Sequence, residues 1–168
     1  MSKLGRRQGI SGKFLQPMEL DLEFYDILVA DKALIDLLYY EHPLRTNDNV
    51  DIDTIRKYLI FQRGFIYELV TDTHCSIFIE TTGGRFNDPL AYHQWTIKIV
   101  IPDKREIISD TGERRMYRIA QRVAELLEHE GFTLGVPTIA SYRTERLNAT
   151  HSITGLQLEF ELGSGRQH

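Results

Sequence analysis

Histidine and cysteine side chains could do chemistry in this chain of 168 residues, which contains six histidines and one cysteine. No two histidines have the spacing of a helical His-Glu-x-x-His metal site, and His129-Glu130 lacks the second histidine. His74 and Cys75 are adjacent in sequence, so a strand would point them to opposite faces. We therefore interpret Cys75 as a small buried thiol rather than as a catalytic nucleophile.

The acidic stretch from Asn47 to Asp53 has the composition of a calcium-binding loop. If Asp51 and Asp53 are the third and fifth ligand positions, Thr54 stands where the loop glycine is required and Ile60 where the closing glutamate is required. A solvent-exposed loop, with Asp53 capping the next helix, is the better interpretation. The sequence predicts no metal site and no cofactor.

Three arginines, Arg115, Arg118 and Arg122, recur at helical spacing and could present one face to phosphate groups. The alternative is a solvent-exposed helix face whose arginines pair with neighbouring acids such as Glu125. The formal net charge is −4, from 20 basic and 24 acidic side chains. This balance favours the alternative and argues against general nucleic-acid binding.

These residues do not form the pattern of a known catalytic site, so we expect a protein without enzymatic activity. A small cytosolic enzyme or ligand-binding domain stays open as an alternative. It would require His74, Cys75 and His93 to converge in one cleft.

The central elements are a strand at residues 95–101, which alternates apolar and polar side chains, and the helix that follows it. Asp110 and Glu113 have the spacing of a capping box at the start of this helix, and Gly131 is placed to end it. The apolar stripe of the helix contains Met116, Ile119, Ala120, Val123, Leu126 and Leu127.

Before this central pair, residues 21–40 have the pattern of one kinked helix or of two short helices divided at Asp31, which would cap the second. The stripe of the first half would be Leu22, Tyr25, Leu28 and Val29. A short helix is predicted after Asp53, with a strand through residues 58–61 as the alternative, and residues 64–70 favour a strand.

Two hairpins complete the predicted sheet. Residues 75–81 form a strand that a loop at residues 82–90 joins to the central strand. Near the end of the chain, residues 138–146 and 153–162 alternate as a second hairpin, with a bulge expected near Gly155. In its last strand, the acids at positions 159 and 161 face away from the apolar side chains.

This order of elements predicts an α+β fold, a mostly antiparallel β-sheet with two main α-helices packed on one face. We expect a flexible arm at residues 1–17, a single domain at residues 18–163 and a short tail at residues 164–168. One cysteine excludes an internal disulfide and favours a reducing compartment. No apolar run approaches the roughly 20 residues of a membrane span, so we expect no membrane partner.

From about residue 91 onward the sequence resembles the tail terminator proteins of long-tailed bacteriophages, also called tail completion or head–tail joining proteins. An early helix is similar as well, whereas the arm at residues 1–17 and an insert at residues 45–73 are longer than the family pattern. The similar segments are the early helix, the central strand, the central helix and the closing hairpin: residues 27–38, 93–99, 118–127 and 142–160.

The resemblance implies a structural virion protein, assembled in the host bacterial cytoplasm, that forms a hexameric ring on the head-proximal end of the tail tube. Such a ring stops tube growth and joins tail to head. The implied partners are other copies of this chain, the tail tube protein and the neck or connector proteins. Genomic DNA would pass through the lumen without specific binding. A neck or head-completion ring protein is the alternative.

The resemblance also suggests roles for particular residues. Glu159 and Glu161 would line the lumen and repel DNA phosphates. Residues of the first hairpin's tip and of the arm would contact a neighbouring subunit, the tube or the connector: Arg85, Phe86, Asn87, Phe14 and Leu15.

Overall fold

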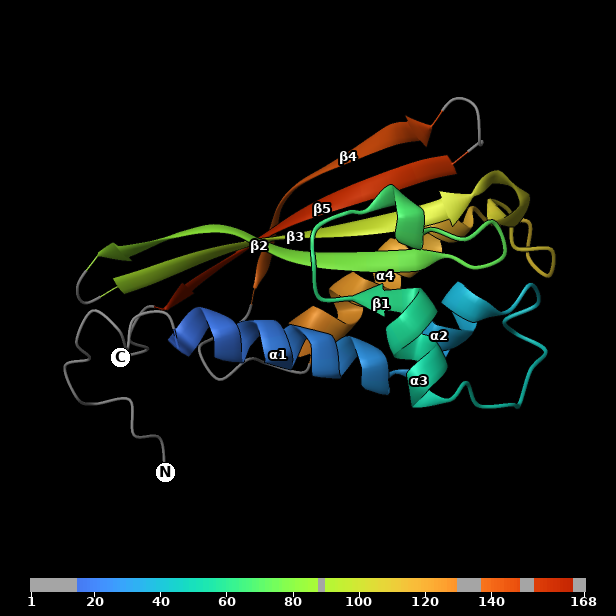
Figure 1. Ribbon diagram of the computed structural model, residues 1–168, viewed down its shortest axis with the longest axis horizontal. Helices are drawn as coiled ribbons and strands as arrows, with labels where there is room; N and C mark the ends of the chain where they lie inside the picture. The colour runs from blue at the N-terminus through green and yellow to red at the C-terminus, as the bar shows by residue number, and fades with distance from the viewer. Residues whose placement is uncertain (1–14, 88–89, 130–136, 149–152, 165–168) are drawn as a thin grey trace.

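The computed structural model describes residues 15–87, 90–129, 137–148 and 153–164. Five strands form one sheet in the order β1-β2-β3-β5-β4, and the main helices pack on one of its faces (Figure 1). β1 is parallel to β2, and the other neighbouring strands are antiparallel. The predicted fold class is therefore confirmed: the protein is a single α+β domain with a mostly antiparallel sheet.

The first two helices are α1 (Leu15–Ala30) and α2 (Lys32–Tyr39). They divide at Asp31 as predicted, and the Asp31 carboxylate accepts a hydrogen bond from the Leu34 amide at 2.8 Å. Residues 15–17 of the predicted arm belong to α1, and residues 1–14 lie outside the described residues.

The buried stripe of α1 contains Tyr25 and Leu28 as predicted, but it does not contain Leu22. Leu22 is 49% exposed, while Leu20 and Phe24 are buried. Phe24 packs on Trp95 with ring centroids 4.8 Å apart, which fixes the rotation of the helix against the sheet.

The next segment contains both of the alternatives that its sequence allowed. A short helix, α3 (Ile52–Thr54), continues as a π-helical turn, η2 (Ile55–Leu59), and leads into the strand β1 (Ile60–Phe61). Asp51 caps this helix by accepting from the Thr54 amide at 2.9 Å, so the predicted cap at Asp53 is wrong. The strand predicted at residues 64–70 is also wrong, because this segment contains a 3-10 turn, η3 (Tyr67–Leu69).

The first hairpin consists of β2 (Ser76–Asn87) and β3 (Leu90–Pro102). The loop predicted at residues 82–90 is wrong, because both strands continue through most of it and project beyond the helices (Figure 1). A register shift between Thr81 and Gly83 marks a bulge. At Gly84 the strands approach so closely that a Cβ atom would lie 2.7 Å from the Tyr92 carbonyl oxygen. Gly84 therefore serves strand pairing here rather than a loop.

After β3 comes a 3-10 turn, η4 (Asp103–Arg105), and then α4 (Arg115–His129). The capping box predicted from Asp110 and Glu113 is wrong, because the helix begins after both residues. The Asp110 carboxylate instead lies 2.8 Å from the Arg45 guanidinium. Gly131, the predicted helix end, lies outside the described residues.

The second hairpin consists of β4 (Thr138–Asn148) and β5 (Ile153–Ser164). β5 lies between β3 and β4, so the last strand along the chain occupies the interior of the sheet. The bulge expected at Gly155 is wrong, because the register shifts lie on β4, between Ile139 and Ser141 and between Arg146 and Asn148. The first shift also places Ile139 on the face of Tyr142 rather than on the predicted face of Ser141.

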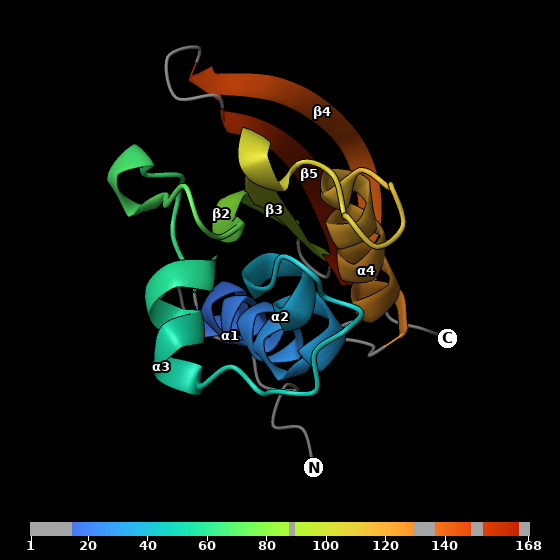
Figure 2. The ribbon, with the colours of Figure 1, turned by 90° about the vertical axis from the view of Figure 1, so that its right-hand side faces the viewer.

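We call the helix-covered side of the sheet the core face. The helices lie within the curve of the sheet on this side (Figure 2). The predicted apolar sets of β3, β5 and α4 are buried here, and Trp95 and Ile97 have no exposed area. The other buried residues of these sets are Ile99, Ile101, Leu156, Leu158, Phe160, Leu162, Met116, Ile119, Val123, Leu126 and Leu127.

The opposite, outer face is covered at one end by the segment at residues 65–70, whose apolar side chains pack on it. Phe65 meets Phe78 edge to face with ring centroids 5.3 Å apart, and Phe61 stacks on Phe78 at 4.8 Å. Val100 and Ile153 complete this second apolar cluster. Ile153 is thus buried on the outer face, which is why the alternation of β5 continues without a bulge.

Candidate assembly surfaces

The other end of the outer face is polar and open. The strand register brings together side chains from β2, β3, β5 and β4 that we call the outer polar surface: Glu80, Tyr92, Gln94, Thr96, Ser141, Glu159 and Glu161. Glu159 and Glu161 face away from the helices, as the alternation of β5 predicts. Three of the seven residues are acids, and two exposed arginines, Arg85 and Arg143, lie beside them on the same face. The acids lie next to solvent between these two flanking arginines.

Glu161 is held in place by two residues of β3. Its carboxylate accepts hydrogen bonds from the Tyr92 hydroxyl and, at 3.0 Å, from the Gln94 amide. Both hydrogen bonds hold the pKa of the Glu161 carboxyl below its usual range, and the bond from Tyr92 has the larger effect. The same carboxylate raises the pKa of the Tyr92 hydroxyl. Glu161 is thus a fixed, ionised carboxylate at neutral pH.

Glu159 is held by side chains of β4 and β5. It accepts from the Ser141 hydroxyl at 2.8 Å and from the Gln157 amide at 3.3 Å. The Gln157 oxygen in turn accepts from the Arg143 guanidinium at 3.1 Å. The polar side chains across these strands therefore form a connected row that fixes where the carboxylates lie.

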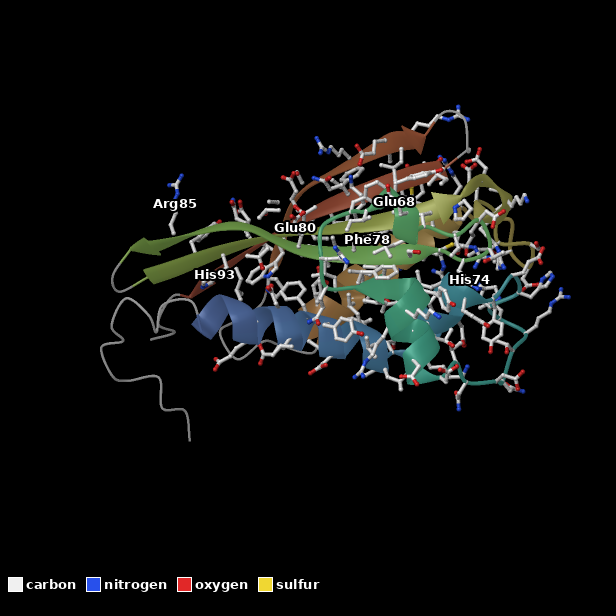
Figure 3. All side chains as sticks on the ribbon, in the orientation of Figure 1. Glu68, His74, Phe78, Glu80, Arg85 and His93 are labelled. Atoms are coloured by element: carbon white, nitrogen blue, oxygen red, sulfur yellow. The ribbon has the colours of Figure 1, made fainter. Side chains whose placement is uncertain are left out.

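The residues predicted to contact partners lie on different parts of the chain. Arg85 is exposed on the projecting hairpin and points away from the helices (Figure 3). Phe86 and Asn87 are the last two residues of β2, and their side chains lie outside the described ones. Leu15 is the first residue of α1, and Phe14 lies outside the described residues. Of the predicted contact residues that the structure describes, it therefore groups only Arg85, Phe86 and Asn87, which are consecutive on β2.

The helix arginines have structural partners. Arg115, predicted on the solvent side, is 1% exposed and donates to the carbonyls of Arg105, Leu37, Tyr40 and Glu41 at 2.7–3.0 Å. Burial lowers the pKa of its guanidinium. Three of these carbonyls belong to the C-terminal end of α2 and the residues after it. Arg115 therefore caps that helix end, where cationic side chains are favoured.

Arg122 acts at the other end of α2. It donates to both carboxylate oxygens of Asp31, the N-cap of α2, at 3.0 and 2.6 Å. Arg115 and Arg122 are seven positions apart, about 10.5 Å along a helix, which matches the length of the eight-residue α2. Because α4 thus holds α2 at both ends, Arg115 and Arg122 stabilise the packing of the two helices rather than presenting a phosphate-binding face. Arg118 pairs with Glu113 at 3.2 Å, so the exposed-face interpretation holds for it.

The histidines and the cysteine do not converge. Ser76 pairs with Val100 and Gly84 with His93, so Cys75 and His93 lie about 27 Å apart along β2. Figure 3 shows His74 and His93 at opposite ends of the sheet. Cys75 is completely buried, and burial raises the pKa of its thiol to about 12. The cleft that the enzyme alternative requires is therefore not formed by these residues.

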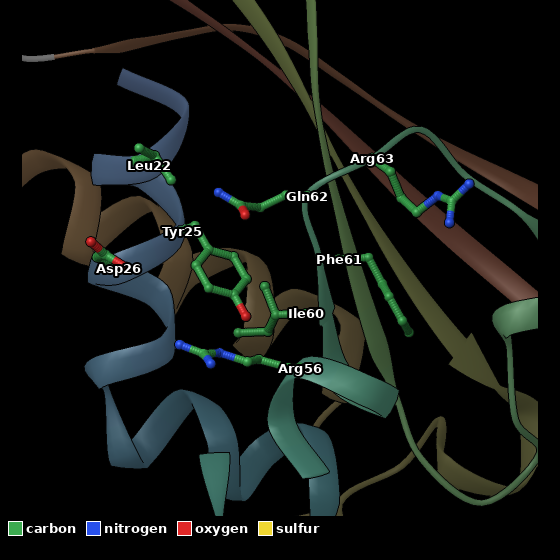
Figure 4. A pocket seen from close by; sticks show the side chains of 8 residues that line it. All are labelled: Leu22, Tyr25, Asp26, Arg56, Ile60, Phe61, Gln62 and Arg63. Carbon is green, nitrogen blue, oxygen red and sulfur yellow. The ribbon is translucent and has the colours of Figure 1, made fainter. Parts of the chain in front are cut away.

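A shallow pocket of about 360 Å³ lies between α1 and the segment that contains β1. Its lining combines apolar, acidic and basic side chains: Leu22, Tyr25, Asp26, Arg56, Ile60, Phe61, Gln62 and Arg63 (Figure 4). Burial raises the pKa of the Tyr25 hydroxyl, although its hydrogen bond with Arg56 acts in the opposite direction. A phenol kept protonated beside an arginine can donate and accept hydrogen bonds but is a poor nucleophile.

Two further findings concern ions and membranes. Within the described ranges, no three His, Cys, Asp or Glu side chains gather closely enough to hold a metal ion. None of the helices described combines the length and the hydropathy that a membrane crossing requires.

Comparison with known proteins gives one family. No curated protein matches the sequence. The model of the YomW family matches residues 31–162, which run from the N-cap of α2 to the end of the buried part of β5. The match covers most of the 168 residues and includes both hairpins and α4. The chain therefore belongs to the YomW family, a phage-derived family.

Proposed function

We propose that this protein is a structural virion component that forms a ring, of six copies, on the head-proximal end of a phage tail tube. The ring stops tube growth and provides the surface that joins tail to head. Membership of a phage-derived family supports the phage context. The resemblance to tail terminator proteins supports the position in the virion.

The observation that carries the proposal is the outer polar surface. Glu80, Glu159 and Glu161 lie on a sheet face that the described helices leave open, and hydrogen bonds fix two of them. In a ring whose lumen this surface lines, the carboxylates of all copies would face the DNA. Like charges repel over roughly 10 Å at physiological salt, so the DNA would slide without binding.

In the same ring, the projecting hairpin with Arg85, Phe86 and Asn87 contacts a neighbouring subunit, the tube or the connector. Phe14 and Leu15 do the same from the N-terminal side of the chain. Exposed loops and projecting elements commonly supply such contacts in symmetric assemblies.

Electron microscopy of a lysate from a phage that lacks this gene tests the position in the virion. Filled heads beside separate tails of irregular or excessive length are the expected result. Heads that have lost their DNA beside tails of normal length would move the protein to the neck ring. Normal, infectious particles would contradict both ring proteins and favour a binding domain or enzyme.

A double substitution, Glu159→Gln with Glu161→Gln, tests the lumen role. The expected result is normal assembly with slower DNA ejection, because each amide keeps the side-chain size and one acceptor oxygen but removes the repulsion. The matched control is Glu113→Gln with Glu128→Gln, which removes the same charge from exposed positions outside the sheet. Equal ejection rates for the two double variants would exclude the lumen role.

A further inference from the structure

Strand β4 is exposed to an unusual degree for a strand of 11 residues. Ile139 is 42% exposed and Tyr142 is 68% exposed, although both lie on the core face of the sheet. Residues 138–144 are exposed on both faces. β4 is therefore held in the subunit mainly by its pairing with β5, and its side chains bury little apolar area.

The outer edge of β4 is also unpaired within the described chain, since β5 is its one neighbour in the sheet. Between its two register shifts, residues 141–146 pair with β5 without interruption. Alternate backbone amides and carbonyls of this regular run point outward. Such an edge is a template for another strand unless it is short or covered; this one is not short, and no described strand covers it.

The opposite side of the sheet has a second free edge. β1 pairs with β2 at Ile77 and Phe78 alone. Farther along β2, residues 81–87 pair with β3 on one side and have no described strand on the other. This stretch projects beyond the helices, and Arg85 is exposed on it (Figures 1 and 3).

The directions of the two edges are compatible. β2 and β5 run one way, and β3 and β4 run the other. If the sheets of neighbouring copies continue in the same orientation, β4 of one copy runs antiparallel to β2 of the next. A contact between two copies of β4 would leave the β2 edge of each copy free. A β4–β2 contact uses both edges of every copy and repeats around a ring.

We infer that residues 141–146 of β4 pair as an antiparallel strand with residues 81–87 of β2 in a neighbouring copy of this chain. The partner is a second copy, and the contact is heterologous. Tyr142 and Ile139 become covered at this contact, and Arg85 lies at it. This inference rests on the proposed ring, because it names the contact that builds it.

Disulfide crosslinking of the full chain tests the pairing. Arg85 on β2 and Arg143 on β4 are both exposed on the outer face, so Arg85→Cys is combined with Arg143→Cys in one chain. Arg85→Cys with Ser141→Cys tests the neighbouring position along the strand. The native Cys75 stays in place, because its buried thiol does not react under mild oxidation.

The expected result for at least one pair is a ladder of crosslinked species up to the closed ring. Mixing the two single-cysteine proteins should stop at the dimer, because each copy then forms one bond. The matched control, Arg85→Cys with Glu128→Cys on α4, should give no ladder. Crosslinked dimers from Arg143→Cys alone would overturn the inference in favour of a symmetric β4–β4 contact.

Sedimentation of the uncrosslinked protein separates failure of this inference from failure of the proposed function. A ring in sedimentation without crosslinks at either position overturns the β4–β2 contact and leaves the ring standing. A monomer at every concentration overturns both. Tyr142→Lys should weaken association at least tenfold with the fold intact, whereas Tyr117→Lys, 46% exposed on α4, should not. Equal association of the two variants overturns the β4 contact.

Discussion

The two ends of the outer face differ although the same strands build them. At one end Phe78 is 1% exposed under Phe65, and two positions along β2 Glu80 lies on the same face next to solvent. The difference is the segment at residues 65–70, which covers the first end and leaves the second open. At the covered end the sheet packs against apolar side chains on both faces, whereas at the open end it does so on the core face alone.

This comparison separates residues that stabilise the fold from residues that are free to serve an interface. Side chains at the covered end contribute through burial, and the arginines of α4 serve the helix layer beneath it. Side chains at the open end contribute little to stability, because their hydrogen bonds to one another replace hydrogen bonds that they would make to water in the unfolded chain. Substitutions should therefore have effects on stability that fall steeply from the covered end to the open end.

The largest effect is expected for Phe78→Ala. Its ring contacts Phe61 and Phe65, so removing it leaves a cavity between the sheet and its cover. The free energy of unfolding should fall by about 4 kcal/mol in urea denaturation. The control is Glu80→Ala, which should change it by less than about 0.5 kcal/mol. Similar losses for both variants would remove the distinction between the two ends.

A somewhat smaller effect is expected for Arg115→Met. The variant keeps much of the volume but leaves the carbonyls of Leu37, Tyr40 and Glu41 without their donor. The free energy of unfolding should fall by about 3 kcal/mol, and amide hydrogen exchange should accelerate in α2. Arg118→Met, at an exposed position on the same helix, should be nearly neutral. A neutral Arg115→Met would mean that water replaces the guanidinium.

Asp31→Asn should cost about 1 kcal/mol at pH 7, because Asn still caps α2 but loses the charge opposite Arg122. Burial would raise the pKa of the Asp31 carboxyl, but hydrogen bonds from Arg122 and Leu34 hold it below its usual range. A lowered folded-state pKa contributes stability above the unfolded value of about 4, and this is lost as the pH falls through the folded value. Wild type and variant should therefore converge in urea denaturation as the pH falls through the lowered folded-state pKa of Asp31. A gap that persists there would contradict the assigned cause.

The smallest effect on stability is expected for Glu161→Gln at the open end. The free energy of unfolding should change by less than about 0.5 kcal/mol. The pKa of Tyr92, which Glu161 raises, should fall toward its ordinary value and can be followed by NMR of labelled tyrosine. The matched variant Glu159→Gln should leave Tyr92 unchanged. An unmoved Tyr92 in both variants would mean that its hydroxyl does not contact Glu161 in solution.

The strands and helices with one apolar side were predictable from sequence. The sets around Trp95, Val123 and Phe160 follow the period of their element, because one face of each is buried. The placement of Glu159 and Glu161 followed from the same alternation. Gln94 and Thr96 share the outer face with them, and the alternation of β3 predicts this placement as well.

Other features depend on contacts between distant segments. The covered end could not be predicted, because Phe65 has a partner in Phe78 that only the folded sheet brings close. Arg115 has the sequence context of a solvent-facing helix residue, and its burial depends on carbonyls at and just after the end of α2, more than 70 positions away. The glycines at 83 and 84 favour a loop by type, yet close strand pairing explains Gly84.

The interior position of β5 has a consequence for synthesis on the ribosome. Every other described element is translated before β5, yet β3 and β4 have no contact in the sheet until β5 lies between them. A nascent chain can form the β2–β3 hairpin early, but the complete sheet must wait for residues 153–164 to leave the exit tunnel. Translation timing thus delays any surface that needs the whole sheet until the subunit is nearly finished.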